Sequence, residues 1–250
     1  MNKIEHALLK SRHLNLAEID SATITPLIDH IKDQVAFSAV ELDKKRIIHP
    51  SCKDQSQLNY FRELRAKLEK YRSAKVILVT AVSPRSGSSF IALNLSAVIA
   101  LDHSRTALLI DAHIENPSNT RLLEMEDEQV GLTDYFDHED LSVGNIITPT
   151  GIQRLKLIPS GKDSELGKEY FTGKHMKNLI NELRERYHDR TIIIDSPCIL
   201  TSADSRIIAE YCDSVILVAP YGKVSEASIL EAANEVGKEK LAGVIINKMY

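Results

Sequence analysis

The chain has 250 residues, 43% of them hydrophobic, and carries 31 Lys and Arg against 35 Asp and Glu for a net charge of −4. This length suits one α/β domain with a helical extension, and the apolar content excludes wholesale disorder. The first 75 residues hold 14 basic and 10 acidic side chains, but no basic cluster is dense enough for general nucleic-acid binding or for a polybasic membrane anchor.

The amino-terminal part predicts helices followed by a linker. Residues 4–12 and 26–37 have the pattern of short amphipathic helices. Residues 41–53 are charged and contain a proline, which is typical of a linker. We therefore expect residues 1–55 to form a helical extension and linker, ahead of a domain that comprises residues 56–250.

A further helix is predicted over residues 57–71. Its apolar side chains recur at helical spacing, and they are Leu58, Phe61, Leu64, Leu68 and Tyr71. This apolar stripe predicts either self-association of the chain or packing of the helix against its own domain. The sequence favours neither alternative over the other.

From residue 76 onward, apolar β-branched runs alternate with helical patterns. The predicted strands are 76–81, 106–111, 154–159, 191–195, 214–219 and 241–246. The predicted helices are 88–101, 174–187, 203–212 and 224–236, and an irregular acidic stretch extends to about Asp140. Such alternation predicts an α/β fold with a mainly parallel sheet covered on both faces. A ligand would then bind at the carboxyl ends of the strands.

The loop over residues 83–89, with the sequence SPRSGSS, has the layout of a phosphate-binding loop. In such a loop, backbone N–H groups and a helix N-terminus hold the anion, and a lysine reaches the outer phosphates. Here Ser88 stands where the lysine would be, and Ser89 stands where a hydroxyl would bind Mg²⁺. Taken alone, a Gly-Ser-Ser turn is more often only a connection between a strand and a helix.

Two aspartates close buried strands at the same predicted edge. Asp111 ends the strand 106–111, and Asp195 ends the strand 191–195. Carboxylates at these positions could order the waters of Mg²⁺ and receive a proton. Each alone could instead cap a turn or a helix. A transition-metal site formed by Asp111 with His113 and Glu115 is a weaker alternative.

The cysteines point to a reducing compartment. Cys52, Cys198 and Cys212 form no CxxC pair and are expected in the core. The other histidines show no metal-ligand spacing. Charged residues interrupt any apolar stretch near the amino terminus, so no signal peptide is predicted, and we expect a cytoplasmic protein.

From about residue 46 to 249 the chain resembles the bacterial tyrosine autokinases of capsule and exopolysaccharide synthesis. Their VTSxxPGEGKTxxAxNLA pattern compares with VTAVSPRSGSSFIALNLS, in which Pro84, Gly87, Ser89, Asn94 and Leu95 fall in register. Their LLIDADxxxPS motif compares with LLIDAHIENPS, which keeps Asp111, Pro117 and Ser118. Their IIIDSPPxL motif compares with IIIDSPCIL, which keeps Asp195 and Pro197.

The resemblance implies a P-loop NTPase fold of the deviant type and a site for ATP or ADP with Mg²⁺. The residues that it assigns to nucleotide binding are Pro84, Arg85, Ser86, Gly87, Ser88, Ser89 and Asn247. Ser89, Asp111 and Asp195 would hold Mg²⁺, and Asp111 and Asp195 would be the catalytic residues.

The chain departs from the family pattern at the positions that matter for turnover. Arg85 replaces a glycine, Ser86 a glutamate and Ser88 the lysine, while His113 replaces the second aspartate of the Asp-x-Asp pair. The tyrosine cluster is absent, with Tyr250 alone at the end. In the Glu-x-x-Arg-x-x-Arg helix that joins subunits in the family, Asn59 replaces the glutamate.

These departures predict a site that either binds nucleotide weakly and without efficient turnover or binds no nucleotide at all. The protein would serve as a regulator or partner of a membrane polysaccharide co-polymerase, or of a related kinase subunit, held at the inner membrane through that partner. The alternative is an active ATP-dependent protein-tyrosine kinase in which Arg85 or a neighbouring subunit's lysine supplies the missing charge. A partitioning-type ATPase that acts on DNA or membrane is a weaker third hypothesis.

Overall fold

The computed structural model describes residues 37–69, 74–125, 129–162, 170–171, 174–187 and 189–247. The two helices predicted within residues 4–37 fall almost wholly outside these ranges, as do Tyr71 and Tyr250. Among the described residues, no helix combines the length and apolar character that crossing a membrane requires.

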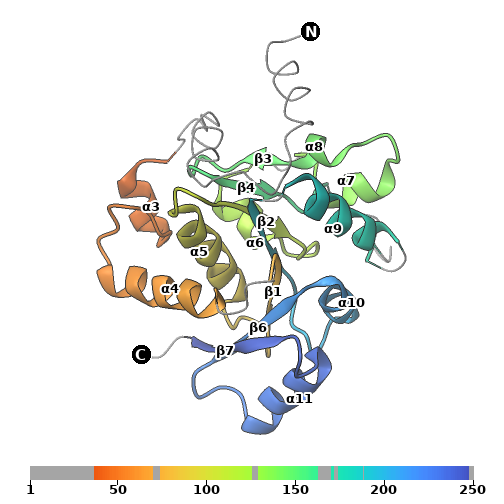
Figure 1. Cartoon of the computed structure of the whole chain (residues 1–250). Helices are drawn as coiled ribbons and strands as arrows, with labels where there is room; N and C mark the ends of the chain where they lie inside the picture. Colours follow the sequence, from red (N-terminus) through yellow and green to blue (C-terminus); the bar gives the residue numbers. More distant parts are fainter. Residues whose placement is uncertain are drawn as a thin grey trace, which may run out of the picture.

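The described residues form one seven-stranded sheet, in the order β3-β4-β2-β5-β1-β6-β7 (Figure 1). All neighbouring strands run parallel except β3, which pairs antiparallel with β4. The strands are β1 (Val76–Ala81), β2 (Thr106–Asp111), β3 (Thr148–Pro149), β4 (Leu155–Ile158), β5 (Arg190–Asp195), β6 (Ser214–Pro220) and β7 (Leu241–Asn247). The predicted α/β fold with a mainly parallel sheet is confirmed.

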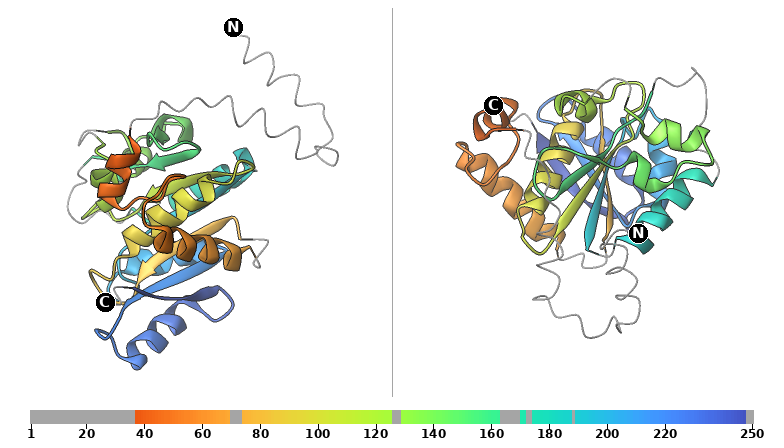
Figure 2. Two further views of the ribbon diagram at one scale, coloured as in Figure 1. Left: turned by 90° about the vertical axis from the view of Figure 1, so that its left-hand side faces the viewer. Right: turned by 90° about the horizontal axis from the view of Figure 1, so that it is seen from above.

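Helices cover both faces of this sheet, as the right-hand view of Figure 2 shows. One face carries α3 (Ala39–Lys45), α4 (Gln55–Leu68), α5 (Ser88–Ala100) and α6 (Ser118–Leu122). The other carries α7 (Leu132–Asp137), α8 (Val143–Ile146), α9 (His175–Arg186), α10 (Ala203–Tyr211) and α11 (Glu226–Val236).

The central strands are apolar along their whole length because both of their faces are buried. In β1, Val76 and Leu78 point into the core shared with α9 and α10, whereas Ile77 and Val79 point into the core shared with α5. The strands β2 and β5 divide in the same way. Because all these strands are parallel, their carboxyl ends meet at one edge of the sheet, where the candidate site lies.

The prediction that residues 41–53 form a linker is wrong. They include most of α3, and a capping box formed by Ser38 and Glu41 stabilises the start of this helix. Ile47 and Ile48 follow and are fully buried, and the Ile48 N–H donates to Oδ1 of Asn94 on α5 at 2.8 Å. The many charged residues of this segment obscure, in the sequence pattern, two apolar residues that pack against the domain.

The acidic stretch that was predicted to be irregular contains two short helices, α6 and α7. Side-chain carboxylates accept hydrogen bonds from backbone N–H groups at the start of both helices. Asp111 accepts from the backbone of α6, and Oδ2 of Asp134 accepts from the N–H of Gly131, just before α7, at 2.9 Å. These aspartates satisfy N–H groups that a helix start leaves without partners.

The predicted helix 57–71 is α4, and its apolar stripe packs against its own domain. Leu58 and Phe61 are buried, and the Phe61 ring meets the Phe90 ring of α5 edge to face, with centroids 6.2 Å apart. Nη1 of Arg65 donates to the carbonyl of Val98 at 3.0 Å. Any contact of α4 with a second subunit would therefore use its polar face, where Tyr60 is 72% exposed.

Candidate functional site

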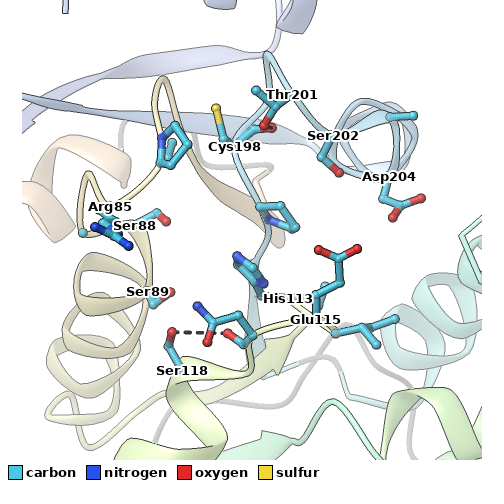
Figure 3. Close-up of a pocket in the computed structure, with 18 of the residues that line it drawn as sticks. Arg85, Ser88, Ser89, His113, Glu115, Ser118, Cys198, Thr201, Ser202 and Asp204 are labelled. Carbon is cyan, nitrogen blue, oxygen red and sulfur yellow. Dashed lines mark hydrogen bonds between the residues drawn. The ribbon is translucent and has the colours of Figure 1, made fainter. Parts of the chain in front are cut away.

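A cavity of about 790 Å³ opens at the carboxyl edge of the sheet. Figure 3 shows that three loops face it: the loop after β1, the loop after β2 and the loop after β5. Its volume lies within the range usual for small-molecule sites. Its lining includes Pro84, Arg85, Gly87, Ser88, Ser89, His113, Glu115, Asn116, Ser118, Phe171, Cys198, Thr201, Ser202 and Asp204.

The loop between β1 and α5 keeps the form of a phosphate cradle. Gly87 is the N-cap of α5 and has a φ of 90°, in the left-handed region that favours glycine. Among the described residues no side chain caps this helix start, so the first backbone N–H groups of α5 have no capping partner at the place where Gly87, Ser88 and Ser89 line the cavity. A 13-residue helix with such an end provides an anion site.

Ser86 and Asn247 shape this loop rather than line the cavity. Ser86 is buried, and its hydroxyl donates to the carbonyl of Ser83 at 2.5 Å. Nδ2 of Asn247, at the end of β7, donates to the carbonyl of Ser86 at 2.8 Å. Asn247 therefore holds the loop against the sheet, and the direct contact with a nucleotide that the family resemblance implies for it stays a prediction.

Asp111 has a structural role as well as a place at the site. Its Oδ2 accepts from the N–H groups of Asn119 and Thr120 at 3.1 and 2.9 Å, and from the Thr120 hydroxyl at 2.9 Å. The carboxylate thus caps α6, as the more ordinary interpretation of the sequence expected. Its second oxygen, Oδ1, has no hydrogen-bond partner within the described part of the chain.

Asp195 lies directly beside Asp111, because the two residues pair in register on β5 and β2. It is fully buried, and its Oδ2 accepts from Nδ2 of Asn119 at 2.8 Å. Asn119 therefore joins the two carboxyl groups, through its backbone to Asp111 and through its side chain to Asp195. The family motifs gave no reason to expect this residue at the site.

Burial and mutual repulsion govern the ionisation of this pair. Burial raises the pKa of Asp195 well above its ordinary value and the Asp111 carboxylate raises it further, while Ser89 and Asn119 lower it. Burial also raises the pKa of Asp111, although hydrogen bonds from Thr120 and the nearby His113 lower it. Two neighbouring buried carboxyl groups do not both ionise readily, so a proton or a cation is favoured between them.

The residues present fit a hydrated magnesium ion. Of the buried polar atoms that have no hydrogen-bond partner among the described residues, four belong to the loops and strand ends of this site: Oδ1 of Asp111, Oδ1 of Asp195, Oδ1 of Asn119 and Nδ1 of His113. Three of them are oxygens, which Mg²⁺ prefers, and Mg²⁺ usually keeps several waters while one or two carboxylates hold it. Asp111, Asp195 and the nearby Ser89 would supply the protein side of such a site.

The charge of the cavity is unfavourable for a triphosphate alone. Among the described residues that line it, Arg85 is the single Lys or Arg, whereas Glu115 and Asp204 are acidic. Ser88, in the lysine position, is largely buried and carries no charge. Arg85 itself has a φ of 61°, a left-handed conformation that is uncommon outside glycine.

The structure brings together most of the predicted site residues. Pro84, Arg85, Gly87, Ser88 and Ser89 line the cavity. Asp111 and Asp195 lie buried next to one another. The weaker alternative of a metal site formed by Asp111, His113 and Glu115 is not supported, because their ligand atoms are not among those that converge within the described chain.

Sequence reasoning placed the start of the third loop, at Asp195, at the site but did not assign the later residues of that loop to it. Thr201, Ser202 and Asp204 face the cavity opposite the phosphate loop (Figure 3). The Asp-Ser-Arg segment that starts at Asp204 matches the family pattern. That match was the only available signal, and it carried no chemical reason for a role at the site.

Several curated relatives of this chain are tyrosine kinases. The chain is 28% identical over 193 residues to the tyrosine-protein kinase CpsD of Streptococcus agalactiae serotype III, covering 76% of this chain and 82% of CpsD. It is 30% identical over 178 residues to the tyrosine-protein kinase YwqD of Bacillus subtilis, covering 70% of this chain and 73% of YwqD. No protein-family model matches the chain.

Solved structures share the fold. The kinase domain of the Escherichia coli tyrosine kinase ETK superposes with a TM-score of 0.73 at 19% identity, covering 95% of this chain and 85% of that one. The Pyrococcus horikoshii septum site-determining protein MinD, solved with Mg-ADP, gives a TM-score of 0.59 at 19% identity over 70% of each chain. With YwqD matched at 30% identity over most of its length, this chain belongs to the bacterial tyrosine-kinase family.

Proposed function

We propose that this chain is a kinase-family protein of exopolysaccharide biosynthesis whose nucleotide site no longer supports efficient phosphoryl transfer. It would act as a regulator or partner of a membrane co-polymerase, or of an active kinase subunit. The observation that carries the proposal is Ser88, a buried neutral side chain where the family places a lysine. The loop around it keeps the cradle geometry.

The missing cation has a large expected effect. Phosphoryl transfer depends almost entirely on positioning and on neutralising developing charge. Loss of one preorganised donor typically costs about 3–4 kcal/mol, or two to three powers of ten in rate. Arg85 and His113 replace further family residues at the same cavity, so more than one contribution to turnover is altered.

A bound nucleotide would still meet groups that suit it. The N–H groups at the start of α5 would hold a phosphate, as helix N-termini do. Ser89, Asp111 and Asp195 would hold Mg²⁺, which neutralises phosphate charge when it is bound. With Glu115 and Asp204 also lining the cavity, we expect binding to depend strongly on Mg²⁺.

The relatives support the biological setting. The succinoglycan biosynthesis transport protein ExoP of Rhizobium meliloti is 26% identical over 185 residues, a region that is 22% of its length. The tyrosine kinase wzc of Salmonella typhimurium matches over 24% of its length. In these relatives the kinase-like region is joined to a much longer protein, which supports a role beside a larger partner.

The second candidate is an active tyrosine kinase, and Arg85 favours it. This side chain lies on the phosphate loop next to Ser88, at the edge of the same cavity (Figure 3). A guanidinium can neutralise phosphate charge, although it cannot simply replace a lysine in position or reach. Under this candidate, Arg85→Gln abolishes transfer of labelled γ-phosphate to tyrosines of the chain.

Isothermal titration with ADP and ATP, with and without Mg²⁺, separates these candidates. We expect weak binding by the wild type, and binding about tenfold to a hundredfold tighter in Ser88→Lys, because a hydrogen bond to a charged group contributes about 1.5–3 kcal/mol. Ser88→Met is the matched control, since it adds length without charge. ATP turnover by the wild type that is lost in Asp195→Ala would overturn the proposed impairment.

A further inference from the structure

A second group of potential metal ligands lies on α3 and on the segment that joins it to α4, outside the lining of the cavity. Asp43, His49 and Cys52 each offer one ligand atom, and all three atoms lie within 4.8 Å of one another. His49 and Cys52 are 4% and 6% exposed, and the Asp43 side chain is 16% exposed. The sequence predicted no metal-ligand spacing here, and Cys52 was expected only as a core residue.

The backbone that carries these ligands is fixed on several sides. Arg46 ends α3 in the left-handed conformation, with a φ of 56°, and turns the chain back toward the helix. The carbonyl of Arg46 accepts from Nε2 of Gln57, and the carbonyl of Cys52 accepts from Nε2 of Gln55. The three ligands are therefore preorganised without a metal, which lowers the cost of binding one.

Within the described residues, the carboxylate of Asp43 and the imidazole of His49 have hydrogen-bond partners, whereas the thiol of Cys52 has none. Nε2 of His49 donates to Oδ1 of Asp43 at 2.9 Å, and the N–H of Lys53 donates to the same oxygen at 3.2 Å. These contacts lower the pKa of Asp43, the bond from His49 having the larger effect. The Cys52 thiol, by comparison, makes no hydrogen bond within the described residues.

The other two cysteines make the contrast clear. The Cys198 thiol donates to the carbonyl of Val82 at 3.2 Å, and the Cys212 thiol donates to the carbonyl of Ile208 at 3.3 Å. Both are satisfied by the backbone. Cys52 is the one described cysteine whose sulfur lies free of such a bond and beside an imidazole and a carboxylate.

We propose that Asp43, His49 and Cys52 bind a single zinc ion, with water as the fourth ligand. One thiolate, one imidazole and one carboxylate form a donor set that suits tetrahedral Zn²⁺. Binding releases the thiol proton of Cys52, while His49 binds as a neutral imidazole whose proton sits on its other ring nitrogen, because zinc ligands must be deprotonated. With the thiolate and Asp43 ionised, the two negative charges balance those of the cation.

The observed geometry is close to what zinc needs. Nitrogen and oxygen ligands at 2.0–2.1 Å from a tetrahedral zinc lie roughly 3.3 Å apart, and sulfur lies roughly 3.5 Å from either. The contact between His49 and Asp43 is 2.9 Å, and no ligand pair exceeds 4.8 Å. Small rotations of the side chains are therefore sufficient, and the ammonium group of Lys53, 3.9 Å from Oδ2 of Asp43 and on an 80% exposed side chain, can move away.

The bound ion would join α3 to the segment that follows it. That segment is attached to α5 through the bond from Ile48 to Asn94, and α5 begins at the phosphate loop. Zinc would thereby stabilise the amino-terminal part of the domain without entering the nucleotide cavity. The proposal does not depend on whether nucleotide binds or turns over.

Titration of the full chain with Co²⁺ tests the proposal directly. Co²⁺ occupies tetrahedral zinc sites and gives a thiolate-to-metal charge-transfer band when cysteine is a ligand. We expect one Co²⁺ per chain with this band, displacement of the band by Zn²⁺, and a higher melting temperature with Zn²⁺. Absence of the band in the folded wild type would overturn the proposal, whatever the variants do.

Variants identify the ligands. Cys52→Ser should lose the band. His49→Gln should weaken metal binding by at least tenfold, because loss of a residue that only hydrogen-bonds to a metal ligand already weakens binding by about tenfold to a hundredfold. Cys198→Ser and Asp111→Asn are the controls, since they alter the nucleotide cavity instead and should keep the band unchanged. A band that disappears in Cys198→Ser and persists in Cys52→Ser would place the metal at the cavity and contradict the assignment.

Discussion

Asp195 is a buried carboxyl group with a second carboxyl group beside it. Burial, followed by the Asp111 charge, raises the pKa of Asp195. The folded protein therefore keeps this proton to a higher pH than the unfolded chain, in which an aspartate has a pKa of about 3.9. Stability from this group is highest at low pH and decreases as pH rises through the folded pKa.

Asp195→Asn should therefore stabilise the protein at neutral and alkaline pH in the absence of Mg²⁺. The amide oxygen can still accept the hydrogen bond from Nδ2 of Asn119, and the substitution removes the buried charge. We therefore expect a gain on the order of 1 kcal/mol or more in the free energy of unfolding at pH 8. Urea denaturation at several pH values measures it. Glu139→Gln, on the surface, should change neither the stability nor its slope with pH.

An equal loss of stability at every pH would contradict this account of Asp195. That result would mean that the pKa of this carboxyl group is the same in the folded and the unfolded chain. A gain that disappears when Mg²⁺ is added would in turn support the metal role, because the cation binds the wild-type pair and not the neutral amide.

At the scale of elements, variants of α4 distinguish packing of its apolar stripe within the domain from self-association of the chain through that stripe. The structure buries the stripe within the domain, with Phe61 6% exposed against Phe90. Phe61→Ala should lower the free energy of unfolding by about 3–5 kcal/mol. Tyr60→Ala, on the exposed face of the same helix, should change it by less than about 0.5 kcal/mol.

Sedimentation of the same two variants tests the oligomer. If α4 joins subunits through its polar face, Tyr60→Ala reduces the assembly and leaves the fold intact. If Phe61→Ala dissociated an assembly while monomer stability stayed unchanged, the stripe would face a second subunit and the packing described above would be wrong.

Sequence patterns predicted the central elements well because their signals are local. The boundaries of β1 and β2 agree with the prediction, since apolar β-branched runs buried on both faces need no partner to be recognised. Asp111 and Asp195 were predicted at the sheet edge for the same reason, because each directly ends such a run. Their pairing in register follows from the strand order, in which β5 lies next to β2.

The failures come from contacts and turns that no local pattern in the sequence marks. Residues 41–53 looked like a linker because Ile47 and Ile48 are surrounded by charges, and only packing against α5 explains their burial. Asp43 and Cys52 meet because Arg46 turns the chain in the left-handed conformation. No periodicity in the sequence marks a turn of this kind, so the cluster could not be predicted from spacing.

At the scale of the whole molecule, Asn94 connects the amino-terminal segment to the sheet domain. Its Oδ1 accepts from the Ile48 N–H, and its Nδ2 donates to the carbonyl of Phe90, within α5. The side chain is completely buried. Asn94 matches the family pattern, and the structure supplies a physical reason for an amide at this position: it satisfies a buried donor from a distant segment.

Asn94→Ala should therefore loosen residues 38–53 relative to the sheet. The substitution leaves the Ile48 N–H buried without a partner, which costs about 1–3 kcal/mol. Native-state hydrogen exchange should show Ile47 and Ile48 losing protection by more than the strand β1 does, since local opening of the segment becomes easier than global unfolding. Ser96→Ala is the matched control, because that buried hydroxyl donates only to Ala92 within the same helix.

The outcome also shows whether the segment that contains α3 unfolds together with the sheet or separately from it. If protection falls equally in residues 38–53 and in β1 for Asn94→Ala, the two regions unfold as one cooperative unit and the amide contributes only to global stability. If the segment alone loses protection, it is a separate, weaker unit. A zinc ion held by Asp43, His49 and Cys52 would then restore its protection, because a ligand that binds only the closed form favours that form.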